Sequence, residues 1–246
     1  MKTPSRRELE LNELRWWANW AKLQWVGKDA YLLSSKELPE TFYNRGGLLS
    51  CDSIASLRSL EGKFSVLGAR PALMVFDGCR GAARALAGSG YLVEDTMTVM
   101  TAAEEATGEA GAETGRAKSA EAWAEAYLKA FYGELSLLPT VLQIVKRLMQ
   151  SDRTTILEAK LDGRVAGTLA AFRTDKLLGV YCVGTIPGFR RRGAAGALIA
   201  HARDLASTEG RVLFLQTLES DRLVPFYLRL GFRVLYRKNL MTKKGY

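Results

Sequence analysis

An apolar strand that runs without a break into a loop of small residues and then a helix constrains the fold of this chain most strongly. The strand is LLGVYCVGTIP (177–187), and the loop and helix follow in PGFRRRGAAGALIAHA (187–202). Buried strands that alternate with helical segments are typical of α/β proteins. This segment therefore predicts an α/β fold with the loop at one end of a buried strand.

The rest of the C-terminal part extends this pattern. Asp162 and Gly163 are typical of a two-residue turn between two strands, and Pro139 is typical of the start of a helix. The predicted order is ααβββαβαβ, with helices over 123–131 and 141–149, strands at 154–161, 164–173 and 177–186, a helix at 193–207, a strand at 211–218, a helix at 221–230 and a strand from 232. This order predicts a mixed, mostly antiparallel sheet flanked by helices.

The 246 residues are enough for two small domains. Large apolar residues vanish at 101–116, where Ala, Glu, Gly and Thr dominate, which predicts a linker or exposed loop. The predicted division is a smaller α/β subdomain at 1–100, this linker, and a main domain at 117–246. Within the subdomain, apolar residues at helical spacing predict a helix over about 5–25, and an apolar run predicts a buried strand at 71–76.

Part of the predicted fold occurs twice in the sequence. GYLVEDTMTVM (90–100) is similar to GFRVLYRKNLM (231–241), and each follows a predicted strand and helix. One interpretation is an internal repeat, in which residues 1–100 are a degenerate copy of half of the C-terminal fold. The other is that any strand–helix–strand unit gives this pattern, because glycine commonly ends a helix. We favour the repeat.

The loop before the helix at 193–207 has the composition of an anion-binding site. Its small residues are Gly193, Ala194, Ala195 and Gly196, and its cations are Arg190, Arg191 and Arg192. Small side chains allow the N–H groups at the helix start to close on a phosphate. The loop matches neither GxGxxG nor GxxxxGK[ST], which disfavours a dinucleotide fold and a nucleoside triphosphatase. The alternative is a tight turn whose glycines serve packing alone.

The net charge of +9 lies wholly in the C-terminal part. Residues 1–172 hold 21 basic and 21 acidic side chains, whereas residues 173–246 hold 14 and 5. A basic segment is typical of a protein that binds a polyanion, such as nucleic acid, a membrane surface or a phosphorylated small molecule. Several of these cations lie near the last strand and the tail: Arg229, Arg233, Arg237, Lys238, Lys243 and Lys244.

The cysteines and the single histidine indicate no metal site. Cys51, Cys79 and Cys182 are widely spaced and form no CxxC pair, which argues against a disulfide framework and a zinc site and fits a reducing compartment. His201 falls in a predicted helix and is expected to be a surface residue. The sequence opens without a secretory signal, and no apolar run reaches the roughly 18 residues of a membrane span. The predicted location is the cytoplasm.

The loop and the order of elements resemble the GNAT (GCN5-related) N-acetyltransferase superfamily. The family signature [RQ]xxGx[GA] lies between a strand and a helix, and Arg190, Gly193 and Ala195 fit it. The resemblance covers about residues 117–246. It implies the GNAT-like acyl-CoA N-acyltransferase fold, with a sheet splayed where the cofactor enters, and acetyl-CoA as co-substrate.

The resemblance also implies roles for particular residues. The cofactor-binding set is Val183, Gly184, Thr185, Arg190, Arg191, Arg192, Gly193, Ala194, Ala195, Gly196 and Ser220. In the family, the loop amides hold the pyrophosphate, the strand backbone pairs with the pantetheine, and one strand N–H polarises the thioester carbonyl. Tyr227 occupies the position whose hydroxyl protonates the departing thiolate. The alternative for Tyr227 is a packed core tyrosine.

The residue that would deprotonate an amine acceptor is left open. Family members often use a carboxylate on the central strands, directly or through water, but the strand at 177–187 has none. Glu158, Asp175, Glu219 and a water chain are the candidates. An acetylated Cys182 would imply ping-pong kinetics, whereas direct transfer is the family norm.

The predicted function is transfer of an acetyl group from acetyl-CoA to a primary amine of an unidentified acceptor, small molecule or peptide, by direct transfer and without a metal. A non-catalytic acyl-CoA sensor or partner-binding module is the first alternative, since the missing carboxylate would then reflect lost chemistry. Nucleic-acid binding through the basic C-terminal segment is the second. The sequence is compatible with an oligomer.

Overall fold

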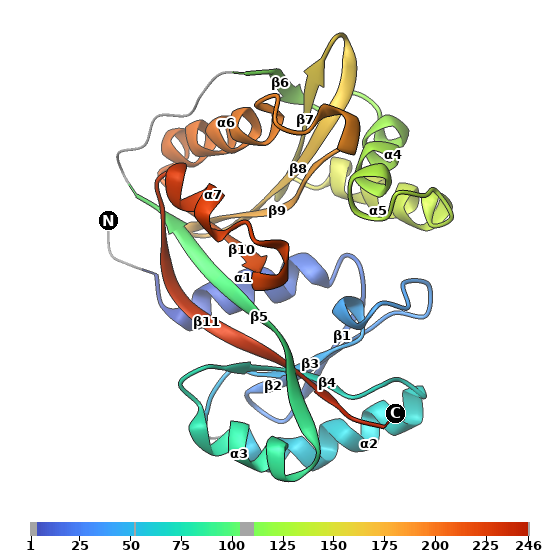
Figure 1. The fold of residues 1–246 in the computed structure, drawn as a ribbon, viewed down its shortest axis with the longest axis vertical. Helices are drawn as coiled ribbons and strands as arrows, with labels where there is room; N and C mark the ends of the chain where they lie inside the picture. Colours follow the sequence, from blue (N-terminus) through green and yellow to red (C-terminus); the bar gives the residue numbers. More distant parts are fainter. Residues whose placement is uncertain (1–3, 52, 104–110, 246) are drawn as a thin grey trace. The chain divides into compact units, whose positions relative to one another are not determined.

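The computed structural model describes residues 4–51, 53–103 and 111–245. These residues belong to two compact units, drawn in Figure 1. The C-terminal unit contains residues 4–5, 100–103, 111–216 and 226–233, and the N-terminal unit contains residues 6–51, 53–99, 217–225 and 234–245. Two long strands, β5 (Tyr91–Ala102) and β11 (Phe232–Lys243), have residues in both units.

The C-terminal unit has the predicted order of elements. They are β6 (Glu113–Arg116), α4 (Ala120–Phe131), α5 (Leu138–Gln150), β7 (Thr154–Leu161), β8 (Arg164–Thr174), β9 (Leu177–Thr185), α6 (Ala194–Thr208), β10 (Val212–Leu218) and α7 (Val224–Arg229). The order ααβββαβαβ is therefore confirmed from α4 to β11. Asp162 (φ 53°) and Gly163 (φ 73°) have the left-handed conformation that the predicted hairpin turn requires.

The strands of the C-terminal unit form the predicted mixed, mostly antiparallel sheet. Their order is β10-β9-β8-β7-β6, and the pairs are antiparallel except for the parallel pair β9–β10. Helices cover both faces (Figure 1): a Cβ at Gly167 would meet Leu198 of α6, whereas a Cβ at Gly184 would meet Phe131 of α4. The fold class predicted from the sequence is confirmed.

The N-terminal unit is a second α/β arrangement. Its remaining elements are α1 (Arg6–Trp17), β1 (Lys22–Val26), β2 (Ala30–Ser34), β3 (Gly46–Leu48), α2 (Leu57–Leu67), β4 (Ala72–Phe76) and α3 (Arg80–Gly88). The strand order is β1-β2-β3-β4-β11, with β3 and β4 parallel and the other pairs antiparallel. Phe64 of α2 and Leu86 of α3 pack on Leu73 and Val75 of β4 in its core. The buried strand predicted at 71–76 is confirmed.

Buried charges hold α1 against β11 in this unit. The Nζ of Lys238 lies 2.9 Å from a carboxylate oxygen of Glu10 and also pairs with Glu13, and Arg45 lies 2.9 Å from Glu13. All four side chains are buried. Two cations and two carboxylates balance here, as buried ions require.

The helix predicted over 5–25 is wrong beyond Trp17. The side-chain amide of Asn19 donates to the carbonyls of Arg15 and Trp16 (3.1 and 2.9 Å), which satisfies the end of α1. The chain then forms the hairpin of β1 and β2, which turns at Gly27 (φ 67°). The apolar residues whose spacing predicted the helix lie in α1 as far as Trp17, and the last of them, Ala21, precedes the hairpin.

The expectation that the cysteines form no disulfide is also wrong. Cys51 and Cys79 are bonded, with Cα atoms 5.0 Å apart. Cys51 follows β3 and Cys79 follows β4, and because these neighbouring strands are parallel, both residues reach the same edge of the sheet. Their separation in sequence concealed this proximity. The argument from cysteine spacing for a reducing compartment loses its support.

The segment predicted as a linker contains strand residues at both ends. Residues 101–102 belong to β5 and residues 113–116 form β6, while residues 104–110 lie outside the described part. The sequence-based division at 1–100, 101–116 and 117–246 remains a prediction. The strand–helix–strand order does occur twice, as β4–α3–β5 and β10–α7–β11. Because an ordinary βαβ pattern would give the same order, the internal repeat is not confirmed.

Candidate active site

The edge of β9 that faces β10 is open over its last residues. The paired register of β9 and β10 ends at Val180 and Leu215, whereas β9 stays paired with β8 as far as Thr185. A strand edge without a neighbour presents backbone donors and acceptors that an extended ligand can use. This is the splay that the family resemblance implied.

The backbone alternation of β9 determines which groups face this edge. The N–H of Ile186 donates to the carbonyl of Ala166, on the side of β8 (2.9 Å). Neighbouring residues of a strand turn their N–H and C=O groups to opposite edges. The backbone N–H and C=O groups of Val183 and Thr185 therefore face the open edge, and those of Gly184 face β8.

Gly184 and Arg190 join β9 closely to the end of α4. A Cβ at Gly184 would lie 2.6 Å from Cε2 of Phe131 and 2.9 Å from Cβ of Ala130, so a side chain here would displace α4. The guanidinium of Arg190 donates to the carbonyls of Thr185 and Ala130, each at 3.3 Å. Arg190 thus connects the loop after β9 with both elements.

The loop after β9 leads through a 3-10 turn (Pro187–Phe189) into the start of α6. Arg191 (φ 61°) and Gly193 (φ 84°) adopt the left-handed conformation. The first helical bond runs from the N–H of Ala197 to the carbonyl of Gly193 (2.9 Å). The N–H groups of the first turn therefore have no acceptor within the helix. These are the N–H groups of Ala194, Ala195 and Gly196.

Gly193 is also in close contact with Gly111. A Cβ built on either glycine would lie 2.9 Å from the Cα of the other. No sequence pattern indicated this contact, because residue 111 falls in the segment predicted as a linker. Any side chain at Gly193 is therefore strained, whereas a Cβ at Gly196 would meet open space.

Arg192 connects the loop to the β7–β8 turn through an ion pair. Its guanidinium lies 2.9 Å from a carboxylate oxygen of Asp162, and both side chains are exposed. Arg190 and Arg191 are exposed as well. The loop thus presents positive charge to solvent beside the free N–H groups of α6, which is the arrangement that an anion needs.

Tyr227 and Ser220 lie in different units. Tyr227 is buried in α7, with its ring centroid 5.2 Å from that of Phe226 and 5.9 Å from that of Phe232. A buried position agrees with either interpretation of Tyr227. Ser220 lies in the N-terminal unit, in a 3-10 turn before α7, and donates its hydroxyl to Asp95. Their roles remain predictions.

Asp175 and Glu219 have surroundings that do not favour a role as base. Asp175 is in the turn before β9, at the opposite end of this strand from Val183, and its carbonyl accepts from Arg211 (2.6 Å). Glu219 is in the N-terminal unit and pairs with Arg237 (3.0 Å). The structure thus removes Asp175 from the predicted pantetheine edge.

Glu158 lies in the same row of cross-strand neighbours as Gly184. It pairs across β7 and β8 with Thr168, which pairs across β8 and β9 with Gly184. Opposed residues point to the same face of a sheet, so Glu158 faces the same side as Gly184. Its carboxylate is buried and lies 3.2 Å from Nζ of Lys160. Two strand spacings, about 10 Å, separate it from β9.

Cys182 lies in β9 beside this row but is a poor nucleophile. Burial raises the pKa of its thiol well above the usual range. Because the thiolate is the reactive form, a thiol held protonated does not favour an acetyl-cysteine intermediate.

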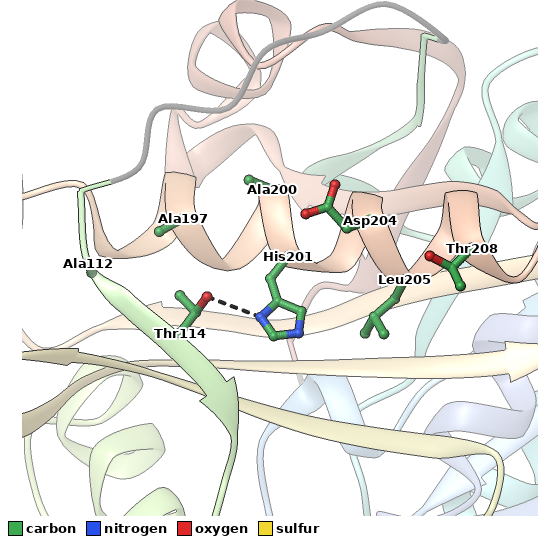
Figure 2. A pocket seen from close by; sticks show the side chains of 8 residues that line it. All are labelled: Ala112, Thr114, Ala197, Ala200, His201, Asp204, Leu205 and Thr208. Carbon is green, nitrogen blue, oxygen red and sulfur yellow. Dashed lines mark hydrogen bonds between the residues drawn. The ribbon is translucent and has the colours of Figure 1, made fainter.

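His201 lines a groove between α6 and the edge strand β6 (Figure 2). The groove has a volume of about 440 Å³ and is bordered by Ala112, Thr114, Ala197, Ala200, His201, Asp204, Leu205 and Thr208. Nδ1 of His201 lies 3.0 Å from Oγ1 of Thr114 and so connects the helix to the strand. His201 is thus half-buried, where the sequence suggested a surface residue.

Several cations of the basic C-terminal segment are neutralised by carboxylates. Lys238 is buried against Glu10 and Glu13 in the N-terminal unit. Lys243 pairs with Glu61 (2.9 Å), and Arg237 pairs with Glu219. Paired cations contribute little to a field that attracts nucleic acid. This segment is a weaker polyanion site than its composition indicated.

Comparisons with known proteins identify the family of residues 120–232. The model of the acetyltransferase (GNAT) family matches residues 120–232. The chain is similar to a GCN5-related N-acetyltransferase from Kribbella flavida, with 16% identity over 100% of this chain and 98% of that chain and a TM-score of 0.73. It is also similar to one from Sphaerobacter thermophilus, with 18% identity, 92% and 83% coverage and a TM-score of 0.67. A comparison with curated proteins gave no match.

Residues 120–232 are thus a domain of the acetyltransferase (GNAT) family. The two structural likenesses, at this low identity, bear out the GNAT-like fold alone. Membership supports acyl-CoA-dependent acetyl transfer in general, and it does not favour the sensor or the nucleic-acid alternative. Among the described residues, no helix is long and apolar enough to cross a membrane, and no group of three or more His, Cys, Asp or Glu residues could hold a metal ion.

Proposed function

We propose that the chain transfers the acetyl group of acetyl-CoA to a primary amine, within a ternary complex. The observation that carries this proposal is the open edge of β9, which leads directly into the exposed loop at the start of α6. A pantetheine chain can pair with such an edge as an added strand does. A diphosphate can accept hydrogen bonds from the free N–H groups of a helix start.

The residues divide between the two parts of the cofactor. The backbones of Val183 and Thr185 would pair with the pantetheine. Gly184, which lies between these two residues, has no side chain and so lets α4 pack closely on β9. The pyrophosphate would be held by the loop residues Arg190, Arg191, Arg192, Gly193, Ala194, Ala195 and Gly196.

The reaction requires a donor at the carbonyl and two proton transfers. The amine nitrogen attacks the thioester carbon, a C–N bond forms, and the C–S bond breaks with loss of the thiolate. The N–H of Val183 would stabilise the oxyanion that develops on the carbonyl. Tyr227 would protonate the thiolate. The amine proton would pass through water to a carboxylate, for which Glu158 has the most suitable sheet position.

Initial-rate kinetics test this function. Release of free CoA thiol is measured with acetyl-CoA and a panel of small amines, lysine peptides and peptide N-termini. We expect amine-dependent release above hydrolysis, with intersecting double-reciprocal lines. Parallel lines would contradict direct transfer. Binding of acetyl-CoA without amine-dependent release across the panel would favour the sensor instead.

A further inference from the structure

The strand that forms the proposed pantetheine edge contains a β-bulge next to that edge. The register of β8 and β9 shifts so that Cys182 and Val183 together stand opposite Leu169. Cys182 has φ 53°, a left-handed conformation that side chains other than glycine adopt rarely. Such a conformation persists only where neighbouring contacts hold it.

One side chain holds the backbone at this bulge. The hydroxyl of Thr168, on β8, donates to the carbonyl oxygen of Cys182 at 2.9 Å. Thr168 is fully buried and Cys182 nearly so. Because threonine is branched at Cβ, its χ1 has few choices. The hydrogen bond is therefore protected from water and made by a side chain with little freedom.

This hydrogen bond fixes the direction of a second group. The carbonyl of Cys182 and the N–H of Val183 belong to one peptide unit, which is planar and trans. The two groups of a trans peptide point in opposite directions. When Thr168 holds the carbonyl on the side of β8, the N–H of Val183 must point to the open edge, in agreement with the backbone alternation of β9.

We propose that Thr168 is a positioning residue that aims the Val183 N–H at the thioester carbonyl of acetyl-CoA. The inference rests on the proposed function and adds a residue on a different strand from the cofactor edge. A hydrogen bond accepted by the carbonyl also polarises the peptide, which makes its N–H a stronger donor. Thr168 acts through the backbone of β9.

The test compares Thr168→Val, which keeps the shape and loses the hydroxyl, with Thr168→Ser, which keeps the hydroxyl. The affinities of acetyl-CoA and free CoA are measured by calorimetry, and the C=O stretch of bound acetyl-CoA labelled with ¹³C at the carbonyl is measured by infrared spectroscopy. In wild type we expect a lower stretching frequency than in solution. In Thr168→Val we expect the frequency to return toward the solution value and kcat to fall about tenfold or more.

The controls separate positioning from stability. We expect free CoA, which has no acetyl carbonyl, to bind Thr168→Val within about twofold of wild type, and Thr168→Ser to recover most of the infrared shift. A Thr168→Val protein that melts earlier but keeps the wild-type frequency and kcat would overturn the proposal and leave the proposed function intact. Failure of wild type to bind acetyl-CoA would overturn both.

Discussion

Two parallel strand pairs, β3–β4 and β9–β10, differ in the segment that comes after the first strand. β9 has a bulge and an open edge and leads into an exposed, arginine-rich loop with Gly193 at φ 84°. β3 has three buried residues, and the chain after it is tied by the Cys51–Cys79 disulfide. The same strand–helix–strand order thus carries the proposed anion-binding loop in the C-terminal unit and a covalent crosslink in the N-terminal unit.

Under the proposed function, this difference predicts which region binds the cofactor and which one stabilises the fold. A cofactor loop needs free N–H groups and small residues, whereas a crosslinked loop restricts the unfolded chain. Changes after β3 should therefore affect stability and spare acetyl-CoA binding, and changes after β9 should do the reverse.

The largest expected effect on stability comes from the disulfide. Replacing both partners (Cys51→Ala with Cys79→Ala) removes a crosslink between residues separated by 28 positions. We expect the free energy of unfolding to fall by about 3 kcal/mol, measured by urea denaturation. Acetyl-CoA affinity, measured on the folded variant, should stay within about twofold of wild type. A parallel loss of affinity would show that the two regions are not independent.

A smaller effect is expected at the far end of α6. Glu209 accepts hydrogen bonds from Arg173 (2.6 Å) and Arg211 (2.9 Å), and the bonds from Arg173 are the main cause that lowers the pKa of its carboxyl from 4.5. A carboxyl whose pKa is lower in the folded state than in the unfolded state stabilises the fold at pH values above the unfolded pKa. This stabilisation is lost as the pH falls through the folded pKa.

Glu209→Gln should therefore lower the free energy of unfolding by about 1 kcal/mol at pH 7. The difference from wild type should begin to shrink below pH 4.5, the ordinary value for this carboxyl. Urea denaturation of both proteins at pH 7 and at pH 3 measures the loss of stability and its decrease at low pH. A difference that stays constant between these pH values would contradict the role of the charge.

The smallest expected effect concerns Arg192. Asp162→Asn breaks an exposed pair and should change stability by less than about 1 kcal/mol. It also frees the guanidinium of Arg192 for a phosphate, so acetyl-CoA affinity should rise about twofold at low salt and return to the wild-type value at high salt. Weaker binding of acetyl-CoA would indicate that Asp162 holds Arg192 in its working position.

The sequence was sufficient for features that depend on neighbouring residues. The Asp162–Gly163 turn, the order from α4 to β11 and the small residues at the start of α6 follow from local pattern. Features that depend on strand neighbours were missed. Cys51 and Cys79 meet because β3 and β4 are parallel neighbours, and Thr168 meets Cys182 because β8 pairs with β9. Neither pairing is encoded in sequence spacing.

The end of α1 and the position of Gly111 were missed for related reasons. The predicted helix extended over residues that pair as a hairpin, so strand pairing overrode the helical pattern. Gly111 lies in a stretch whose composition is typical of a linker, yet its backbone packs on Gly193. Composition reports flexibility of an isolated chain and carries no information about such a contact.

The most direct test of the central claim is calorimetric titration of acetyl-CoA into wild type, Gly196→Glu and Gly196→Gln. Gly193 is unsuitable because any side chain there is strained. Gly196 has open space, and a carboxylate in the first turn of a helix is compatible with folding. We predict micromolar binding by wild type, a loss of about 100-fold in Gly196→Glu and a much smaller loss in Gly196→Gln, because the repulsion of the pyrophosphate comes from the charge. Equal affinities for Gly196→Glu and Gly196→Gln would contradict the assignment of the pyrophosphate to this loop.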